Sequence, residues 1–288
     1  MGKDLYFECV GGASGDMCLG ALVDLGMPVA LLQEAMDGLL GAGAVAFGQS
    51  HREEHGIRAT QLAVDVLEQG THHRHLEHIL GMIGGSSLPD PVKTSASEVF
   101  RRLADAEGHV HGMPPEKVHF HEVGAVDAIA DITGTCLGLH HLGVERVFTG
   151  PLKTGRGTIH AAHGVIPVPA PATLALVKGR TLQYLDMEGE LTTPTGAALL
   201  CTLGEERLSL AIRPERTGYG CGSKTFPGLP NLLRATLGQA DEAACATHGH
   251  GRCGGEGHHH CHGHHHDQDG PHEHHHDHDH DHDNGGPS

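Results

Sequence analysis

At 288 residues the chain is long enough to bury a full hydrophobic core, in one large or two small domains. Its formal net charge of −17 argues against nucleic acid as the main partner, because a phosphate backbone repels an acidic surface. We expect no membrane partner either, since the longest apolar runs are far too short to span a bilayer. The N-terminal apolar run, Leu5–Val10, is also too short for the core of a signal peptide. Eight cysteines with no CxxC pair among them therefore indicate a cytoplasmic protein with reduced thiols.

The first half of the chain alternates between predicted strands and helices. Residues 4–10 have the pattern of a buried strand, which ends in the glycine-rich sequence GGASGD. Apolar residues at helical spacing predict helices from residue 16 to 26 and from 29 to 40. Residues 44–50 and 57–66 predict strands, and residues 73–83 and 93–107 predict two further helices.

The second half continues this alternation. Residues 119–123 are predicted to be extended, residues 124–142 helical and residues 146–152 a strand. Residues 153–171 are rich in Gly and Pro, so we expect an irregular segment that is either mobile or functional. Helices at 171–177 and 195–203 and strands at 208–213 and 232–237 complete the pattern. The alternation predicts an α/β fold, with a mixed α+β arrangement as the alternative.

The composition changes abruptly after residue 240. Residues 241–288 hold most of the 30 histidines, mixed with Asp and Gly and with almost no apolar residues. Such a segment buries too little surface to offset its ordering entropy, so we expect a disordered tail after a folded body of residues 1–240. Its dense imidazoles and carboxylates predict weak binding of several divalent metal ions.

The sequence HFHEVGAVDAIAD, residues 119–131, carries the strongest metal-site signal. His119 and His121 point to the same side of an extended segment, and Asp127 and Asp131 share one face of a helix. Imidazole nitrogens and carboxylate oxygens are ligands for Zn, Ni, Fe or Mn. Glycines at positions 124, 134 and 138 lie in the same helical stripe and leave it open to a ligand or a close neighbour. The alternative is that both aspartates point to solvent.

Two other segments are weaker candidates. A glycine-rich turn before a helix, with Gly12, Ser14, Gly15 and Asp16, exposes backbone N–H groups to a phosphate. By itself the sequence favours the simpler alternative, a tight turn in which Ser14 or Asp16 caps the helix. His160 and His163 lie on a proline-flanked loop and are either metal ligands or surface residues. Glu190, Thr192 and Thr193 precede a helix, where capping suffices as an explanation.

Five sequences resemble, in order, the motifs of the LarC family, the pyridinium-3,5-bisthiocarboxylic acid mononucleotide nickel insertion proteins. They are LYFECVGGASGDMCLGALVDLG, KVHFHEVGAVDAIADI, GTIHAAHGVIPVPAPAT, GELTTPTGAALL and GYGCGSKTFPGLPNLLRATLG. The resemblance covers residues 4–238. It implies a lyase that inserts nickel into a pyridinium mononucleotide substrate, forming a carbon–nickel bond in the nickel-pincer cofactor of lactate racemase. It also implies dependence on CTP with Mn or Mg.

This resemblance implies roles for the candidate residues. A substrate phosphate favours the phosphate interpretation of Gly12, Ser14, Gly15 and Asp16. Nickel is expected at a set drawn from His119, His121, Asp127, Asp131, His160 and His163. His121, Glu122 and Asp127 are the expected catalytic residues. The alternatives from other classes are a non-catalytic nickel storage protein or metallochaperone, and a metal-dependent phosphohydrolase that uses the same side chains to activate water.

The chain departs from the family pattern in two places. Glu8 stands where an aspartate is usual, and the similarity ends near residue 239 although family members continue into a further C-terminal domain. We therefore expect a separate C-terminal domain polypeptide to complete the enzyme, and an oligomeric assembly.

Overall fold

The computed structural model describes residues 2–67, 74–120, 126–161 and 164–241, apart from the side chain of His119. These residues belong to one unit that spans residues 1–249, and a second unit spans residues 250–288. The predicted boundary between body and tail at residue 240 stays a prediction, because almost all of the tail lies outside the described residues.

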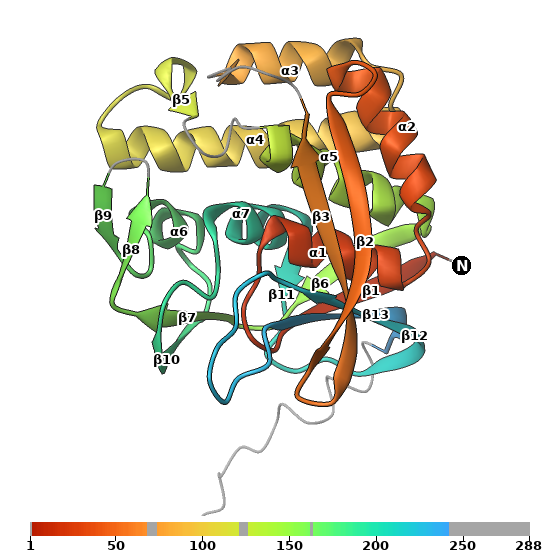
Figure 1. Ribbon diagram of the computed structural model, residues 1–288, viewed down its shortest axis with the longest axis vertical. Coiled ribbons are helices and arrows are strands. Elements are labelled where there is room, and N and C mark those ends of the chain that lie inside the picture. Colours follow the sequence, from red (N-terminus) through yellow and green to blue (C-terminus); the bar gives the residue numbers. More distant parts are fainter. Residues whose placement is uncertain (1, 68–73, 121–125, 162–163, 242–288) are drawn as a thin grey trace, which may run out of the picture. The chain divides into compact units, whose positions relative to one another are not determined.

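Seven strands form the main sheet, in the order β11-β6-β1-β13-β12-β3-β2 (Figure 1). The pairs β1–β6, β6–β11 and β3–β12 are parallel, and the other neighbours are antiparallel. The α/β prediction is confirmed, with a sheet of mixed direction. The strands are β1 (Lys3–Cys9), β2 (Val45–Glu54), β3 (Ile57–Val66), β6 (Val144–Thr149), β11 (Gly204–Glu206), β12 (Ile212–Cys221) and β13 (Leu232–Ala240).

Three small two-stranded sheets lie outside the main sheet. They pair β4 (Arg74–His75) with β5 (His119–Phe120), β7 (Leu152–Arg156) with β10 (Leu182–Glu188), and β8 (Thr158–Ala161) with β9 (Gly164–Pro167). The prediction that residues 153–171 are irregular was wrong, because most of this segment forms β7, β8 and β9. Strands of four or five residues interrupted by Gly and Pro leave no alternating pattern in the sequence.

The strand predicted at residues 208–213 was also misplaced, since β12 begins at Ile212 and continues to Cys221. Pro214, Gly218 and Gly220 obscure the strand pattern in this stretch. The two glycines have a packing reason. A Cβ at Gly220 would lie 2.7 Å from the backbone nitrogen of Ala21, so only a glycine lets helix α1 (Gly15–Asp24) approach this strand.

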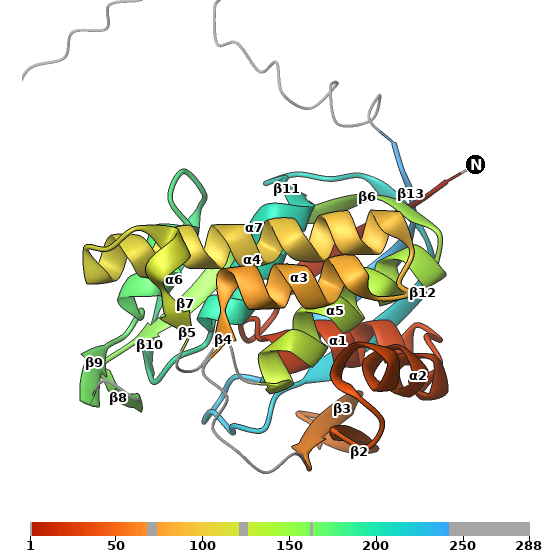
Figure 2. The ribbon, with the colours of Figure 1, turned by 90° about the horizontal axis from the view of Figure 1, so that it is seen from above.

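The helices gather on one side of the main sheet (Figures 1 and 2). Helix α1 packs on β12, β3 and α5, whereas α4 packs on α5, α6 and α7. All predicted helices are confirmed, but that of residues 73–83 begins at Leu76 because Arg74 and His75 pair as strand β4. No described helix has the length and apolar character that a bilayer crossing requires. Besides α1 they are α2 (Val29–Leu40), α3 (Leu76–Gly85), α4 (Asp90–His111), α5 (Val126–His141), α6 (Pro171–Leu176), α7 (Pro194–Leu203) and a 3₁₀ turn (Pro115–Lys117).

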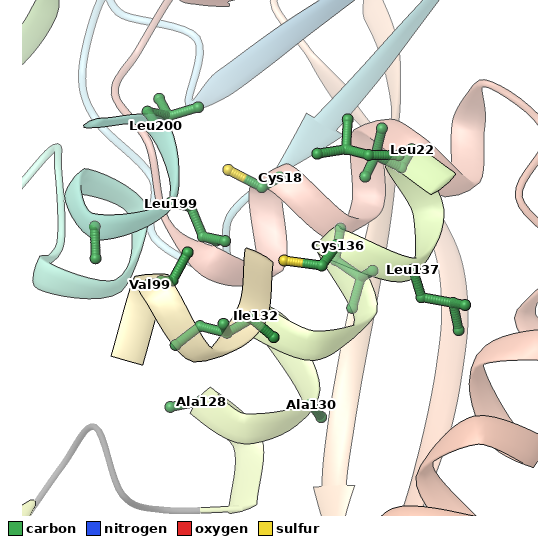
Figure 3. Packing of buried hydrophobic residues seen from close by; sticks show 14 of the residues in the cluster. Cys18, Leu22, Val99, Ala128, Ala130, Ile132, Cys136, Leu137, Leu199 and Leu200 are labelled. Carbon is green, nitrogen blue, oxygen red and sulfur yellow. The ribbon is translucent and has the colours of Figure 1, made fainter. Parts of the chain in front are cut away.

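The core is aliphatic and contains buried thiols. Figure 3 shows side chains of α1, α4, α5 and α7 converging, with Cys18 and Cys136 among leucine, isoleucine and valine. Burial raises the pKa of the Cys136 thiol to about 12, so this residue behaves as a small apolar side chain. The five described cysteines are all free and buried.

The glycine stripe of α5 explains how closely this helix approaches its neighbours. A Cβ at Gly134 would lie 2.7 Å from Leu32, and one at Gly138 would lie 2.8 Å from Met27 and 2.9 Å from Leu22. At these two positions the stripe therefore meets side chains of α1, α2 and the turn between them, not a ligand. This close packing brings Asp131 of α5 against Gly15 in the first turn of α1.

Candidate functional site

A cavity of about 420 Å³ lies where the first turns of three helices meet strand β3. The N-terminal ends of α1, α5 and α7 contribute Ser14–Asp16, Asp127–Ala128 and Thr193–Thr195 respectively. Each helix N-terminus directs unpaired backbone N–H groups and a positive dipole end toward its surroundings. The lining also contains four carboxyl side chains: Asp16, Asp127, Asp131 and Glu190.

The GGASGD loop is joined to the segment before α7. Ala13 forms an isolated parallel bridge with Thr192, and its backbone nitrogen donates to the Leu191 carbonyl at 3.0 Å. The Thr193 nitrogen in turn donates to the Ala13 carbonyl at 3.0 Å. Gly12 has φ +129°, and an added Cβ there would overlap Leu191. The joined loops thus hold the N-termini of α1 and α7 side by side.

Two further contacts tighten this junction. A Cβ at Gly196 would lie 2.7 Å from the Ser14 nitrogen, so the first turn of α7 sits directly on the loop. The Thr193 side chain caps α7 by accepting a hydrogen bond from the Gly196 nitrogen at 3.2 Å. Capping by Thr193 is therefore confirmed.

Asp131 is the most unusual side chain in the cavity. Its Oδ1 atom is buried and has no hydrogen-bond partner in the structure. The carboxyl lies against Gly15, where an added Cβ would be 2.7 Å from the Asp131 Cβ. Burial, and then the nearby charges of Asp16 and Asp127, raise the pKa of Asp131 well above its usual value. An empty cavity therefore favours the neutral acid, whereas a bound cation favours the carboxylate.

The other three carboxyl groups differ in exposure. Asp16 is partly buried and accepts a hydrogen bond from the Ser14 hydroxyl. Burial raises the pKa of Asp16, although the Ser14 hydrogen bond and the charge of Lys224 act in the opposite direction. Asp127 is exposed and accepts from the Ala128 nitrogen at 2.8 Å, which fixes it at the start of α5. Glu190 is only 8% exposed.

This arrangement combines two opposite preferences in one cavity. Carboxylate oxygens bind cations and accept protons, whereas helix N-termini and a glycine-rich turn bind anions. Within the described parts of the chain, no three His, Cys, Asp or Glu side chains are placed so as to hold a metal ion by themselves. The cavity therefore suits a ligand that carries both an anionic group and a cation, with the ligand contributing to coordination.

The family model of the nickel insertion protein matches residues 5–265. This chain belongs to the nickel insertion protein family. It is 48% identical over 241 residues to a putative nickel insertion protein of Geobacter sp. (strain M21), covering 83% of this chain and 62% of the relative. It is 49% identical over 242 residues to a pyridinium-3,5-bisthiocarboxylic acid mononucleotide nickel insertion protein of Desulfitobacterium hafniense (strain DSM 10664 / DCB-2), covering 83% and 60%. The chain thus spans about 60% of the length of these relatives, and no solved structure matches it.

The structure brings five of the predicted site residues of this nickel insertion family member into one cavity: Ser14, Gly15, Asp16, Asp127 and Asp131. Gly12 supports the loop without lining the cavity. His160 is exposed on β8 and does not line it either. The backbone of His119 lies in β5, while its side chain and the predicted residues His121, Glu122 and His163 lie outside the described residues. All assignments of these residues to nickel or to catalysis stay predictions.

Sequence reasoning missed several polar residues of the cavity. Glu190 was interpreted as part of a helix cap. Its place in the sequence GELTTPTG, directly before a helix N-terminus, is a signal from which a site residue could have been predicted. Gln61 and Ser223 also line the cavity. Neither has a local signal, because each reaches the cavity through the pairing of β3 with β12 and the loop that follows.

The departure from the family pattern at Glu8 lies away from the cavity lining. Glu8 is on β1 directly opposite Arg234 of β13, and the two form an ion pair. The hydrogen bond to Glu8 raises the pKa of Arg234, which favours the charged guanidinium. The glutamate is therefore accommodated by a cross-strand partner outside the cavity lining.

Proposed function

We propose that this chain inserts nickel into pyridinium-3,5-bisthiocarboxylic acid mononucleotide, the step that completes the nickel-pincer cofactor of lactate racemase. The single observation that carries this proposal is the cavity itself. It joins four carboxyl groups to three helix N-termini in a member of the nickel insertion protein family. A mononucleotide with one phosphate, a pyridinium cation and two sulfur donors matches both of these features.

In this proposal the phosphate docks at the turn formed by Gly12, Ser14, Gly15 and Asp16. Backbone N–H groups at the start of α1 hold the anion, and the positive dipole end of α7 adds to the attraction. The ring then lies over Asp127 and Asp131. The pyridinium charge and the nickel ion offset the mutual repulsion of the carboxylates.

Nickel is taken up by Asp127 and Asp131 together with His119 and His121, with His163 as a further ligand. His160 is left out of this set because it is exposed on β8 and does not line the cavity. Oxygen and nitrogen donors from the protein give way to the thiocarboxylate sulfurs of the substrate, which are softer and suit nickel well. Because burial raises the pKa of Asp131, a cation that binds in the cavity favours loss of the Asp131 proton.

The insertion exchanges one proton for one metal ion. The ring C–H bond breaks, its electron pair forms the carbon–nickel bond, and the proton passes to a general base. His121, Glu122 and Asp127 are the proposed base and its orienting groups. No net oxidation takes place, because Ni²⁺ enters and H⁺ leaves.

The chain spans about 60% of the length of its relatives, so the properties of the whole enzyme are also part of this proposal. They are a lyase activity that depends on CTP with Mn or Mg, a separate C-terminal domain polypeptide, an oligomeric assembly and a cytoplasmic location. The His-rich segment of residues 241–288 collects nickel and raises its concentration near the cavity, as a tethered ligand does.

The decisive test is nickel insertion by purified variants. Product formation from the mononucleotide, Ni²⁺, CTP and Mg²⁺, in the presence of the C-terminal polypeptide, is followed by mass spectrometry. We expect His121→Ala and Asp127→Ala to abolish the product. The controls His78→Ala and Asp105→Ala, both exposed on other helices, leave it unchanged. Full activity in both site variants would overturn the assignment, and nickel binding with no product in the wild type would favour the storage alternative.

A further inference from the structure

The loop of residues 222–225 reaches the cavity through one residue. Ser223 is part of the lining. A Cβ at Gly222 would lie 3.3 Å from the Met17 sulfur, so the loop touches the first turn of α1. It therefore lies beside the helix end where the proposed phosphate site is located.

Every residue of this loop is fixed by a hydrogen bond from one of two side chains. Arg52 of β2 and Asn231, which directly precedes β13, supply these side-chain donors. Arg52 is itself held by an ion pair with Glu54 at 2.9 Å, and Glu54 accepts from the Asn231 nitrogen at 3.4 Å. Arg52 donates to the Gly222 carbonyl (2.9 Å), the Ser223 carbonyl (3.1 Å) and the Thr225 hydroxyl (3.2 Å), and the Asn231 amide donates to the Lys224 carbonyl (2.9 Å).

Lys224 is the residue whose side chain this arrangement leaves available. Its backbone is fixed, its side chain is exposed, and it forms no ion pair with any described residue. Its charge nevertheless acts on Asp16 inside the cavity and opposes the rise in the pKa of that carboxyl. A fixed backbone with an available ammonium group is a suitable arrangement for binding an anion at the cavity mouth.

We propose that Lys224 binds the phosphate monoester of the nucleotide, in concert with the Ser223 hydroxyl and the first turn of α1, and that Arg52 positions it. The inference rests on the proposed function for the identity of the substrate. It also resolves a conflict in that proposal. Asp16 brings a carboxyl group to a phosphate site, and the charge of a nearby ammonium group offsets the repulsion between the two anions.

A binding experiment without nickel tests this inference separately from nickel insertion. The probes are nicotinic acid mononucleotide and the matching riboside, which differ only in the phosphate. We expect Lys224→Met to weaken binding of the nucleotide roughly 10- to 100-fold, as for a lost charge-assisted hydrogen bond, and to leave the riboside unchanged. Lys224→Arg should keep most of the preference, and the exposed lysine variant Lys178→Met should keep all of it.

Two results would overturn the inference. One is an unchanged nucleotide affinity in Lys224→Met, and the other is an equal loss for nucleotide and riboside. A third variant, Arg52→Met, tests the positioning role. It should lose part of the preference for the nucleotide although Lys224 is present, and an undiminished preference would contradict that role. If Lys224→Met loses the preference but the wild type inserts no nickel, the phosphate site stands and the proposed function fails.

Discussion

Replacing Asp131 by Asn should make the empty protein more stable while it removes a residue of the proposed nickel site. The Oδ1 atom of Asp131 is buried without a partner, and two further carboxyl groups, Asp16 and Asp127, act on it. Asparagine has nearly the same shape but no charge to bury. Both side chains leave a buried polar atom without a partner, a cost of about 1–3 kcal/mol that they share, so the gain comes from removing the charge, whose burial without a partner costs more. We expect a gain of roughly 1–3 kcal/mol at pH 8, or about 2–4 °C per kcal/mol for a domain of this size.

The raised pKa of Asp131 determines how the stability difference between Asp131→Asn and the wild type changes with pH. The pKa of Asp131 is raised in the folded state, so between the unfolded value of about 3.9 and the raised value the folded protein binds more protons. Stability contributed by this group therefore falls as pH rises through that window. Asp131→Asn lacks the group, so its advantage over the wild type should be small near pH 4 and largest at pH 8.

Thermal unfolding with a chelator present, followed by circular dichroism at both pH values, measures the difference. The matched control is Asp105→Asn, an exposed carboxylate on α4, which should stay within about 0.5 kcal/mol of the wild type. An Asp131→Asn protein that is less stable than the wild type at pH 8, or equally shifted at both pH values, would refute the account of this side chain.

Three further predictions concern the surroundings of the cavity. Gly15→Ala should destabilise the protein by about 1–3 kcal/mol because the added methyl group meets Asp131. Gly81→Ala, with open space around it in α3, should be neutral or slightly stabilising. Equal melting temperatures for the two variants would disprove the close contact. Thr193→Ala should cost about 1 kcal/mol in a denaturant titration through loss of the α7 cap, and no change would show that the cap contributes nothing. Deleting residues 242–288 should reduce nickel insertion at limiting Ni²⁺ but not at saturating Ni²⁺; a loss at both concentrations would argue for storage.

Much of the fold could be predicted because its signals are local. The helices and the strands of the N-terminal half repeat apolar residues with clear periods, and GGASGD was correctly placed between β1 and α1. The short strands β7, β8 and β9 could not be predicted, because Gly and Pro interrupt them and pairing with another segment makes them strands.

The cavity could be predicted only in part, for the same physical reason. Asp127 and Asp131 are four residues apart, so their shared helical face follows from the sequence. That Gly15 lies against Asp131 depends on how α1 packs on α5. Likewise, Glu190 reaches the cavity through the bridge between Ala13 and Thr192. Both contacts join segments far apart in the chain, and no local pattern encodes them.

The central claim is that nickel enters the nucleotide at the carboxyl groups of this cavity. Its most direct test is a single-turnover insertion reaction with the full chain, Ni²⁺, CTP, Mg²⁺, the proposed C-terminal polypeptide and the mononucleotide. Mass spectrometry detects the gain of nickel and the loss of one proton. The account predicts stoichiometric product for the wild type and none for the Asp127→Asn/Asp131→Asn double variant, which should be folded by its melting curve. Product formed by the folded double variant at the wild-type rate would contradict it.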